Sequence, residues 1–297
     1  MDIFNNGMNL IYKVKAEISI NEVLISKFHL SKKLKSKLIN SKNVLLNGSF
    51  VDTRAIAHLG DLITLVLDYA EDNSNIVPKK IDLDIIYEDE FLLAINKPAG
   101  IPVHPSLLHY EDSLANGVKF YYNSIGLKKK IRAVNRIDLN TSGLVLFAKN
   151  EYIQEQLIKQ MNNKDFIKTY LAIVCGKLDK KEGIINAPIA RKENSIIERC
   201  ISPLGQSAVT HYNVLKEFND YSFIECSLET GRTHQIRVHF ANLGNPLLGD
   251  TLYGNSKNAL INRQALHSYK MDFVHPITLK EITLIADIPN DILSLIR

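Results

Sequence analysis

The 297-residue chain has few of the residues that mark disulfide-rich, zinc-binding or membrane proteins. It contains no tryptophan and only three cysteines, Cys175, Cys200 and Cys226, which are odd in number and far apart. Without a Cys-X-X-Cys pair, neither a disulfide framework nor a zinc site is predicted. No apolar run approaches the roughly 18 residues of a membrane span, and the first residues lack the pattern of a signal peptide. These absences predict a cytoplasmic protein.

The chain also has little net charge and no glycine-rich phosphate loop. Its 36 Lys and Arg residues stand against 32 Asp and Glu residues, a formal charge of +4 that does not by itself indicate a nucleic-acid partner. Hydrophobic residues make up 45% and charged residues 23%, which is ordinary for a globular protein. The length favours one large domain and a small one.

Positive charge is concentrated between residues 27 and 54, where Asp52 is the single acid. Leu30, Leu34 and Leu38 recur at four-residue spacing, and Ser31 is placed to cap the helix that this spacing predicts. Its outer face carries lysines, which is compatible with either a solvated surface or an RNA contact. The Asn-Gly pair at 47–48 predicts a hairpin, and an apolar strand is expected over 60–67.

A polar, aperiodic segment over 69–80 predicts a linker, with the domain boundary near Val77. The prediction is therefore a small α+β domain over 1–77 and a larger domain over 78–297. In the larger part, strand patterns recur over 85–88, 91–95, 166–174 and several short runs up to 228, and helices are expected over 112–122 and 151–161. The predicted class is α+β, with an extended mixed, mostly antiparallel sheet flanked by helices.

The stretch over 133–149 places polar residues directly before an uninterrupted apolar run at 144–148, a pattern typical of a strand buried on both faces. Asp138 lies at the edge of that strand. Burying a carboxylate there costs free energy unless it has an ion partner or a functional role. The alternative is that Asp138 only accepts hydrogen bonds from nearby backbone amides in its turn.

A second polar motif occupies 228–244. Thr233 is a candidate N-cap, Ile236, Phe240 and Leu243 share one face of the predicted helix, and Gly244 ends it. Arg232 then lies at the helix N-terminus, which favours anions. His234 and His239 are five residues apart and point to different faces, so a metal site is not predicted.

Five segments of the sequence together resemble the motifs of the RluA-type pseudouridine synthases. The resemblance rests on Asn-Arg-Ile-Asp-Leu-Asn-Thr-Ser-Gly-Leu-Val-Leu-Phe-Ala-Lys (135–149), Asn-Lys-Pro-Ala-Gly (96–100), Lys-Thr-Tyr-Leu-Ala-Ile-Val-Cys-Gly (168–176), Thr-Gly-Arg-Thr-His-Gln-Ile-Arg-Val-His (230–239) and Pro-Leu-Leu-Gly-Asp-Thr-Leu-Tyr-Gly (246–254). The family usually has His at the position of Asn135. These segments follow one another in the family's order, which makes the resemblance specific.

The resemblance implies roles for individual residues. Asp138 would be the catalytic residue, Arg232 its ion partner and Tyr170 the ring that stacks on the target uracil. Arg136 would fill the gap left by the flipped nucleotide. The substrate site would include Asn135, Thr141 and Ser142, while Lys97 and His104 would be scaffold or phosphate contacts.

The N-terminal part resembles the alpha-L RNA-binding domain, through the order of its basic helix, Asn-Gly hairpin and Gly-Asp strand. RNA contacts are expected from Lys33, Lys35, Lys37 and Arg54, and from Lys129 and Lys130 in the basic loop before Asp138.

The implied activity is the isomerisation of uridine to pseudouridine in RNA, without a cofactor or a metal. Large-subunit ribosomal RNA is the favoured substrate and transfer RNA the alternative; a monomer is expected. Two other functions compete. A non-catalytic RNA-binding protein of ribosome assembly would share the basic helix, and a glycosidase would need a second carboxylic acid, for which Glu229 and Asp250 are candidates.

Overall fold

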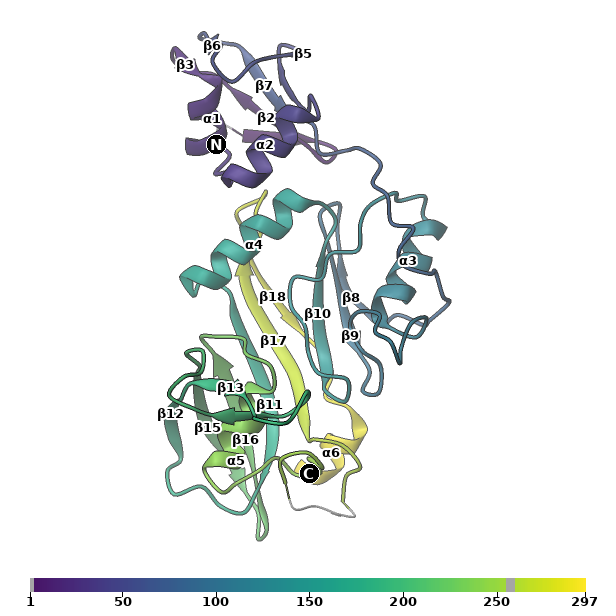
Figure 1. Ribbon diagram of the computed structural model, residues 1–297, viewed down its shortest axis with the longest axis vertical. Helices are drawn as coiled ribbons and strands as arrows, with labels where there is room; N and C mark the ends of the chain where they lie inside the picture. Colours follow the sequence, from purple (N-terminus) through teal and green to yellow (C-terminus); the bar gives the residue numbers. More distant parts are fainter. Residues whose placement is uncertain (1–2, 255–259) are drawn as a thin grey trace.

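A computed structural model describes residues 3–254 and 260–297. The N-terminal part is a five-stranded sheet, in the order β1-β2-β7-β4-β5, with two helices and a short strand pair (Figure 1). Its elements are β1 (Ile3–Asn6), β2 (Asn9–Lys13), β3 (Ile18–Ser19), α1 (Ile20–Ser26), α2 (Lys32–Asn40), β4 (Val44–Leu46), β5 (Ser49–Phe50), β6 (Ile56–Ala57) and β7 (Leu62–Leu65).

Helix α2 confirms the predicted amphipathic helix. The Ser31 side chain accepts a hydrogen bond from the Leu34 amide at 3.1 Å, which satisfies one of the free donors at the helix start. Leu34 and Leu38 are buried against the sheet, and the lysines lie on the other face. The predicted hairpin is also present, because β4 and β5 pair antiparallel around Asn47 and Gly48, both with positive φ.

The larger part is built on a nine-stranded sheet, in the order β12-β15-β16-β11-β17-β10-β9-β8 with β18 beside β17 (Figure 1). The strand pairs are antiparallel except β10 with β17, so the predicted mixed, mostly antiparallel sheet is confirmed. The strands are β8 (Ile85–Glu88), β9 (Leu92–Lys97), β10 (Ser142–Ala148), β11 (Ile167–Cys175), β12 (Glu182–Asn186), β15 (Val209–Glu217), β16 (Tyr221–Leu228), β17 (Leu266–Val274) and β18 (Glu281–Ile285).

Four helices and a second strand pair flank this sheet. They are α3 (Leu114–Ser124), α4 (Glu151–Asn163), α5 (Gln235–Asn242), α6 (Asn290–Ile296), β13 (Ile189–Arg191) and β14 (Arg199–Ile201). No helix in the described ranges has both the length and the apolar character needed to cross a membrane.

Strand β10 is buried along its whole length, as the apolar run at 144–148 predicts. It approaches β17 very closely at Gly143, which has a φ of +109°. A Cβ atom there would lie 2.2 Å from the carbonyl oxygen of Ser268. Only glycine fits both this backbone conformation and this spacing, and the contact fixes the strand that follows Asp138.

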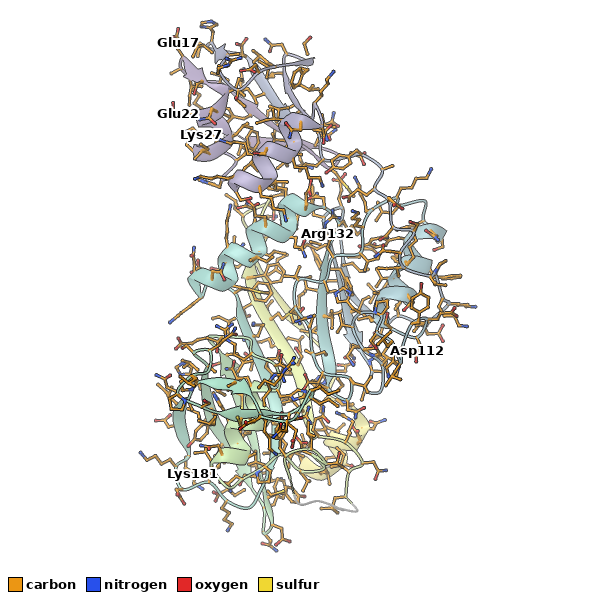
Figure 2. The ribbon with its side chains drawn as sticks, in the orientation of Figure 1. Glu17, Glu22, Lys27, Asp112, Arg132 and Lys181 are labelled. Carbon is orange, nitrogen blue, oxygen red and sulfur yellow. The ribbon has the colours of Figure 1, made fainter. Side chains whose placement is uncertain are left out.

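The segment predicted to be a linker is tied to the larger part by buried contacts. Lys129 is 2% exposed, and its ammonium donates to the carbonyls of Leu67 and Tyr69, both at 2.8 Å. Glu71 forms an ion pair with Arg132, which Figure 2 shows beside the end of the sheet nearest the N-terminal part. The expected RNA contact by Lys129 is therefore wrong, because its charge is used inside the protein. The domain boundary near residue 77 stays a prediction.

Helix α4 lies between the N-terminal part and the sheet (Figure 1). Its Glu155 carboxylate accepts a 2.7 Å hydrogen bond from the Ser31 amide at the start of α2. Its Glu151 forms an ion pair with Lys37, whose side chain is 45% exposed. Lys37, expected to contact RNA, is instead bound to the neighbouring part of the protein.

Candidate active site

A cleft of about 940 Å³ opens beside the starts of β10, β11 and α5. It is lined by all three residues predicted to form the catalytic site: Asp138, Tyr170 and Arg232. They come from three separate segments of the sequence. The fold therefore gathers these residues in one place, although it does not pair them as expected.

Asp138 is presented by a tight turn just before β10. The Thr141 amide donates to the Asp138 carbonyl oxygen at 3.1 Å, which closes the turn. The next carbonyl, that of Leu139, accepts hydrogen bonds from the Gly100 amide at 2.9 Å and the Lys97 ammonium at 3.0 Å. The Pro-rich loop after β9 thus supports the turn from behind, and Lys97 is scaffold rather than a substrate contact.

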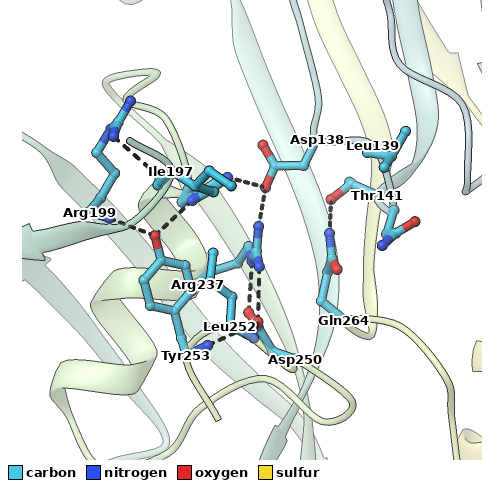
Figure 3. A network of polar contacts seen from close by, with 12 residues as sticks. Asp138, Leu139, Thr141, Ile197, Arg199, Arg237, Asp250, Leu252, Tyr253 and Gln264 are labelled. Atoms are coloured by element: carbon cyan, nitrogen blue, oxygen red, sulfur yellow. Dashed lines mark hydrogen bonds and ion pairs between the residues drawn. The ribbon is translucent and has the colours of Figure 1, made fainter. Parts of the chain in front are cut away.

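The ion partner of Asp138 is Arg237, not Arg232. Arg237 Nη1 donates to Asp138 Oδ2 at 3.0 Å. The same guanidinium binds Asp250 through two parallel hydrogen bonds, Nε to Oδ2 at 2.7 Å and Nη2 to Oδ1 at 2.9 Å. Figure 3 shows Arg237 between the two carboxylates. Such a two-point contact fixes the plane of the guanidinium, so that its third nitrogen is held at Asp138.

Arg232 lies in the exposed loop before α5, where its Nε donates to the Ser207 carbonyl at 2.9 Å. The pairing with Arg232 was expected from the family resemblance alone, and the helix was separately predicted to start one residue too early. Thr233 is not the N-cap; His234 occupies that position, with a φ of +59° and no side-chain cap bond. The helix consequently begins at Gln235, and Arg237 lies in its first turn facing the cleft.

His234 and Tyr253 extend the network around Asp138. His234 Nε2 lies 3.8 Å from Asp138 Oδ2, and its Nδ1 lies 2.7 Å from the Tyr253 hydroxyl. That hydroxyl also accepts a hydrogen bond from the Arg199 amide at 2.9 Å (Figure 3), which holds the Tyr253 ring in place beside His234. Burial lowers the pKa of His234, opposed by the charge of Asp138. Burial therefore favours the neutral form of the ring, whose Nε2 is directed toward Asp138.

The other oxygen of Asp138 is not engaged. Every hydrogen bond and ion pair of this carboxylate within the described residues uses Oδ2, and its side chain is 25% exposed to the cleft. Tyr170, 6% exposed, lines the same cleft from β11. Burial raises the pKa of Tyr170 to about 12, and the nearby Asp138 charge acts in the same direction. The ring is therefore a neutral phenol beside an ionisable carboxylate with one open oxygen.

Comparisons with known proteins identify the family of this chain. A family model described as RNA pseudouridylate synthase matches residues 91–242, which include Asp138, Tyr170 and Arg237. The chain is 41% identical over 292 residues to an uncharacterized RNA pseudouridine synthase, YhcT, of Bacillus subtilis, covering 95% of this chain and 96% of the relative. The chain belongs to the RNA pseudouridylate synthase family.

Further relatives agree with this assignment. The synthase is 35% identical over 271 residues to the ribosomal large subunit pseudouridine synthase D of Xylella fastidiosa, covering 87% of this chain and 81% of the relative. Its fold resembles that of human RNA pseudouridylate synthase domain containing 1, with a TM-score of 0.58 at 22% identity, over 69% of this chain and 83% of that one. The family makes the protein an isomerase that acts on RNA.

The structure places Asn135, expected to contact substrate, inside the synthase's backbone network. Its Oδ1 accepts from the Leu146 amide at 2.9 Å and its Nδ2 donates to the Leu144 carbonyl at 3.1 Å. Asn135 thus joins the segment before Asp138 to β10. Both polar atoms of its side chain are therefore bound to the backbone of β10, while Asn135 also lines the cleft, and its contact with the substrate stays a prediction.

The remaining predicted substrate residues divide between two sides of β10. Thr141 lines the cleft, where its hydroxyl accepts from Gln264 at 3.3 Å. Ser142 faces the opposite side and lies 2.9 Å from the ring of His267, which corrects its assignment. Arg136 is exposed at the cleft, as its expected role requires, and His104 lies on the same wall.

The remaining predicted RNA contacts and the competing acids can also be located. Lys33, Arg54 and Lys130 are exposed, and Arg54 pairs with Asp52 at 2.9 Å; the half-buried Lys35 donates to Asn21 at 2.6 Å. Glu229, a candidate glycosidase acid, is paired with Lys164 and His211. Asp250, the other candidate, is buried on Arg237, so neither is placed as a proton donor.

Arg237 and His234 are the two residues that sequence reasoning missed. Both were within the recognised motif, and the structure shows that positions 235–240 are all buried although three of them are polar, which the sequence alone did not reveal. A buried arginine requires a carboxylate partner, and the Gly-Asp pair at 249–250 offered one. Among the described residues, no group of three or more His, Cys, Asp or Glu side chains is placed to hold a metal ion.

Proposed function

We propose that the protein converts a uridine of large-subunit ribosomal RNA to pseudouridine, with Asp138 as the residue that acts on the nucleotide. The observation that carries the proposal is the asymmetry of the Asp138 carboxylate. Oδ2 is held by Arg237 at 3.0 Å, while Oδ1 has no partner in the described part of the chain and Asp138 lines the cleft. The bond to Arg237 fixes the carboxylate through one oxygen, so the other oxygen is open to the substrate.

Reactant and product are isomers, which sets what the residues must do. The N1–C1′ bond of uridine breaks, the uracil turns, the C5–C1′ bond forms, and the proton lost from C5 is balanced by one gained at N1. Oδ1 of Asp138 either attacks C1′ or removes the 2′ proton; both require an ionised oxygen that no protein donor covers. Arg237 keeps this oxygen oriented through its two bonds to Asp250.

Tyr170 is proposed to stack on the uracil while it turns. A target base must leave the RNA helix to enter such a cleft, and an aromatic wall offsets the stacking that is lost. Since the pKa of Tyr170 is about 12, its hydroxyl stays protonated at neutral pH. Stacking and hydrogen bonding therefore suit it better than removal of the C5 proton as a free base.

Support for a ribosomal substrate comes from the printed names of relatives. Proteins named ribosomal large subunit pseudouridine synthase D in Xylella fastidiosa, Pasteurella multocida and Vibrio cholerae are 34–35% identical over most of this chain. The basic face of α2, where Lys33 is exposed, is proposed to bind RNA outside the cleft. Helix α4 would then fix the distance between that contact and Asp138.

The test is tritium release from an unmodified large-subunit ribosomal RNA transcript labelled at C5 of uridine. The wild-type protein should release tritium, and Asp138→Asn should reduce the rate by at least about 10²-fold because the open oxygen loses its charge. Asp179→Asn, an exposed acid away from the cleft, is the matched control. An Asp138→Asn protein that works at the wild-type rate would refute the role of Asp138. Release only from transfer RNA transcripts would refute the ribosomal substrate.

A further inference from the structure

Lys168 stands out in the cleft as a half-buried cation that the proposed chemistry does not use. It lies on β11, two residues before Tyr170, so both side chains point to the same face of the strand and both line the cleft. It also lines a smaller hollow of about 200 Å³ that continues from the cleft beside the end of α4. Its side chain therefore lies where the cleft and the smaller hollow meet.

The ammonium of Lys168 has no hydrogen-bond or ion-pair partner within residues 3–254 and 260–297. Burial lowers the pKa of Lys168, and no carboxylate acts in the opposite direction. The contrast with Lys164, four residues earlier, is direct, because Lys164 forms an ion pair with Glu229. The second oxygen of Glu229 is bound to His211 at 2.7 Å, so this carboxylate is already committed.

The surroundings of Lys168 suit an anion. A Cβ atom on Gly231 would lie 3.5 Å from Lys168 Nζ, which puts the ammonium against the backbone of the loop between β16 and α5. That loop also carries the exposed Arg232, which lines the same cleft. A buried and unpaired charge destabilises a folded protein, so such a lysine is expected where a ligand supplies the opposite charge.

We infer that Lys168 is a phosphate-binding residue that holds the RNA backbone beside the nucleotide stacked on Tyr170. The inference rests on the proposed function for the identity of the anion. Two residues of a strand span roughly 6.6 Å, which brings the ammonium within reach of a phosphate attached to the nucleotide whose base is on Tyr170. The contact would fix the position of the strand and would not discriminate between bases.

The first test measures RNA binding as a function of salt, with a short fluorescent oligouridylate and the full chain in an Asp138→Asn background that prevents turnover. Each phosphate neutralised on a single strand contributes about 0.7 to the slope of log affinity against log salt concentration. Lys168→Met should lower that slope by about 0.7, whereas Lys168→Arg should keep it. Lys180→Met, which removes an exposed charge away from the cleft, should leave it unchanged.

The inference is overturned if the slopes of Lys168→Met and Lys180→Met are equal, or if the parent protein does not bind the oligonucleotide at low salt. Thermal unfolding separates a ligand contact from a structural role. Removing an unpaired buried charge should leave the unfolding midpoint of Lys168→Met equal to or above that of the parent, and a lower midpoint would show that Lys168 is structural. If the slope changes as expected but wild-type protein releases no tritium, the phosphate site stands and the proposed function fails.

Discussion

The two carboxylates bound to Arg237 differ in almost every respect. Asp250 is fully buried, and both of its oxygens accept hydrogen bonds, from the guanidinium and from the amides of Leu252 and Tyr253. Burial alone would raise the pKa of Asp250, but the hydrogen bonds of Arg237 outweigh it and lower that pKa. Asp138 is 25% exposed and has one oxygen open. Asp250 fixes the position of the Arg237 guanidinium, and that guanidinium in turn fixes one oxygen of Asp138.

This division separates stability from chemistry within a single network. A carboxylate that reacts must leave an oxygen uncovered and open to the substrate, so it lacks some of the hydrogen bonds that would stabilise the fold. Substitutions at the Asp250 end should therefore reduce stability more than those at the Asp138 end. The order of their effects on the free energy of unfolding is a direct test of this difference.

The largest loss is expected for Asp250→Asn. Removing the charge leaves the buried guanidinium of Arg237 without its two-point partner, and breaking a buried ion pair typically costs about 3–5 kcal/mol. Urea unfolding at neutral pH measures the change, with the exposed Asp179→Asn as control. A loss of unfolding free energy below about 1 kcal/mol would mean that the ion pair of Arg237 with Asp250 contributes little to stability. The proposed difference between Asp250 and Asp138 would then be refuted.

Acid should destabilise the support behind the Asp138 turn independently of either carboxylate. His267 bonds Ser142 at 2.9 Å, and burial lowers its pKa to about 4. Because the unfolded ring has a pKa of about 6.5, the unfolded state binds the extra proton first, so stability falls as the pH drops below 6.5 and levels off below 4.

The size of the His267 effect is about 3 kcal/mol, from 1.36 kcal/mol for each pH unit between the two pKa values. Urea unfolding at pH 7 and pH 4 should show this loss in wild type and equally in Asp138→Asn. In His267→Asn the drop in stability between pH 7 and pH 4 should be smaller than in wild type. It should not disappear, because His104, His234 and His239 also have lowered pKa values. An unchanged pH dependence in His267→Asn would refute the assignment.

A smaller effect is expected for Tyr253→Phe. The change removes the hydroxyl that binds His234 Nδ1 and the Arg199 amide, and each buried group left unpaired costs about 1–3 kcal/mol. The His234 ring also loses the contact that fixes its tautomer, so tritium release should fall and its pH profile should shift. If stability falls but the pH profile is unchanged, Tyr253 supports the fold without influencing Asp138.

The smallest loss of stability is expected for Asp138→Asn, below about 1 kcal/mol, because the carboxylate is partly exposed and Arg237 keeps Asp250. The same substitution should have the largest effect on tritium release. Asp138→Asn and Asp250→Asn, each measured for unfolding and for tritium release on one preparation, should therefore rank in one order by loss of stability and in the opposite order by loss of activity. Equal losses of stability would show that the two ends are equivalent.

Features set by neighbours in sequence were predictable. The cap at Ser31, the hairpin at Asn47 and the buried strand over 144–148 each depend on residues within one turn or one strand. The basic loop before Asp138 was harder to interpret, because charge does not tell which way a side chain points. Lys130 is exposed as expected, while Lys129 and Arg132 turn inward to bind the segment that precedes β8.

The pairing within the site was not predictable, for a geometric reason. Arg232 and Arg237 belong to the same motif, and the choice between them depends on where α5 begins. That start is set by the left-handed backbone of His234, which in turn contacts Tyr253 from a distant loop. The family resemblance assigned the ion pair to Arg232, whereas the arginine that reaches Asp138 lies five residues further along, in the first turn of α5.

The close approach of β10 to β17 has a consequence for how freely this sequence can vary. In a saturation library, position 143 should accept glycine alone, since any larger residue would meet the Ser268 carbonyl at 2.2 Å. The loss would not be confined to packing, because Asp138 lies five residues away on the chain that this contact anchors. A position that never meets the substrate would then be as intolerant of change as the one proposed to react with it.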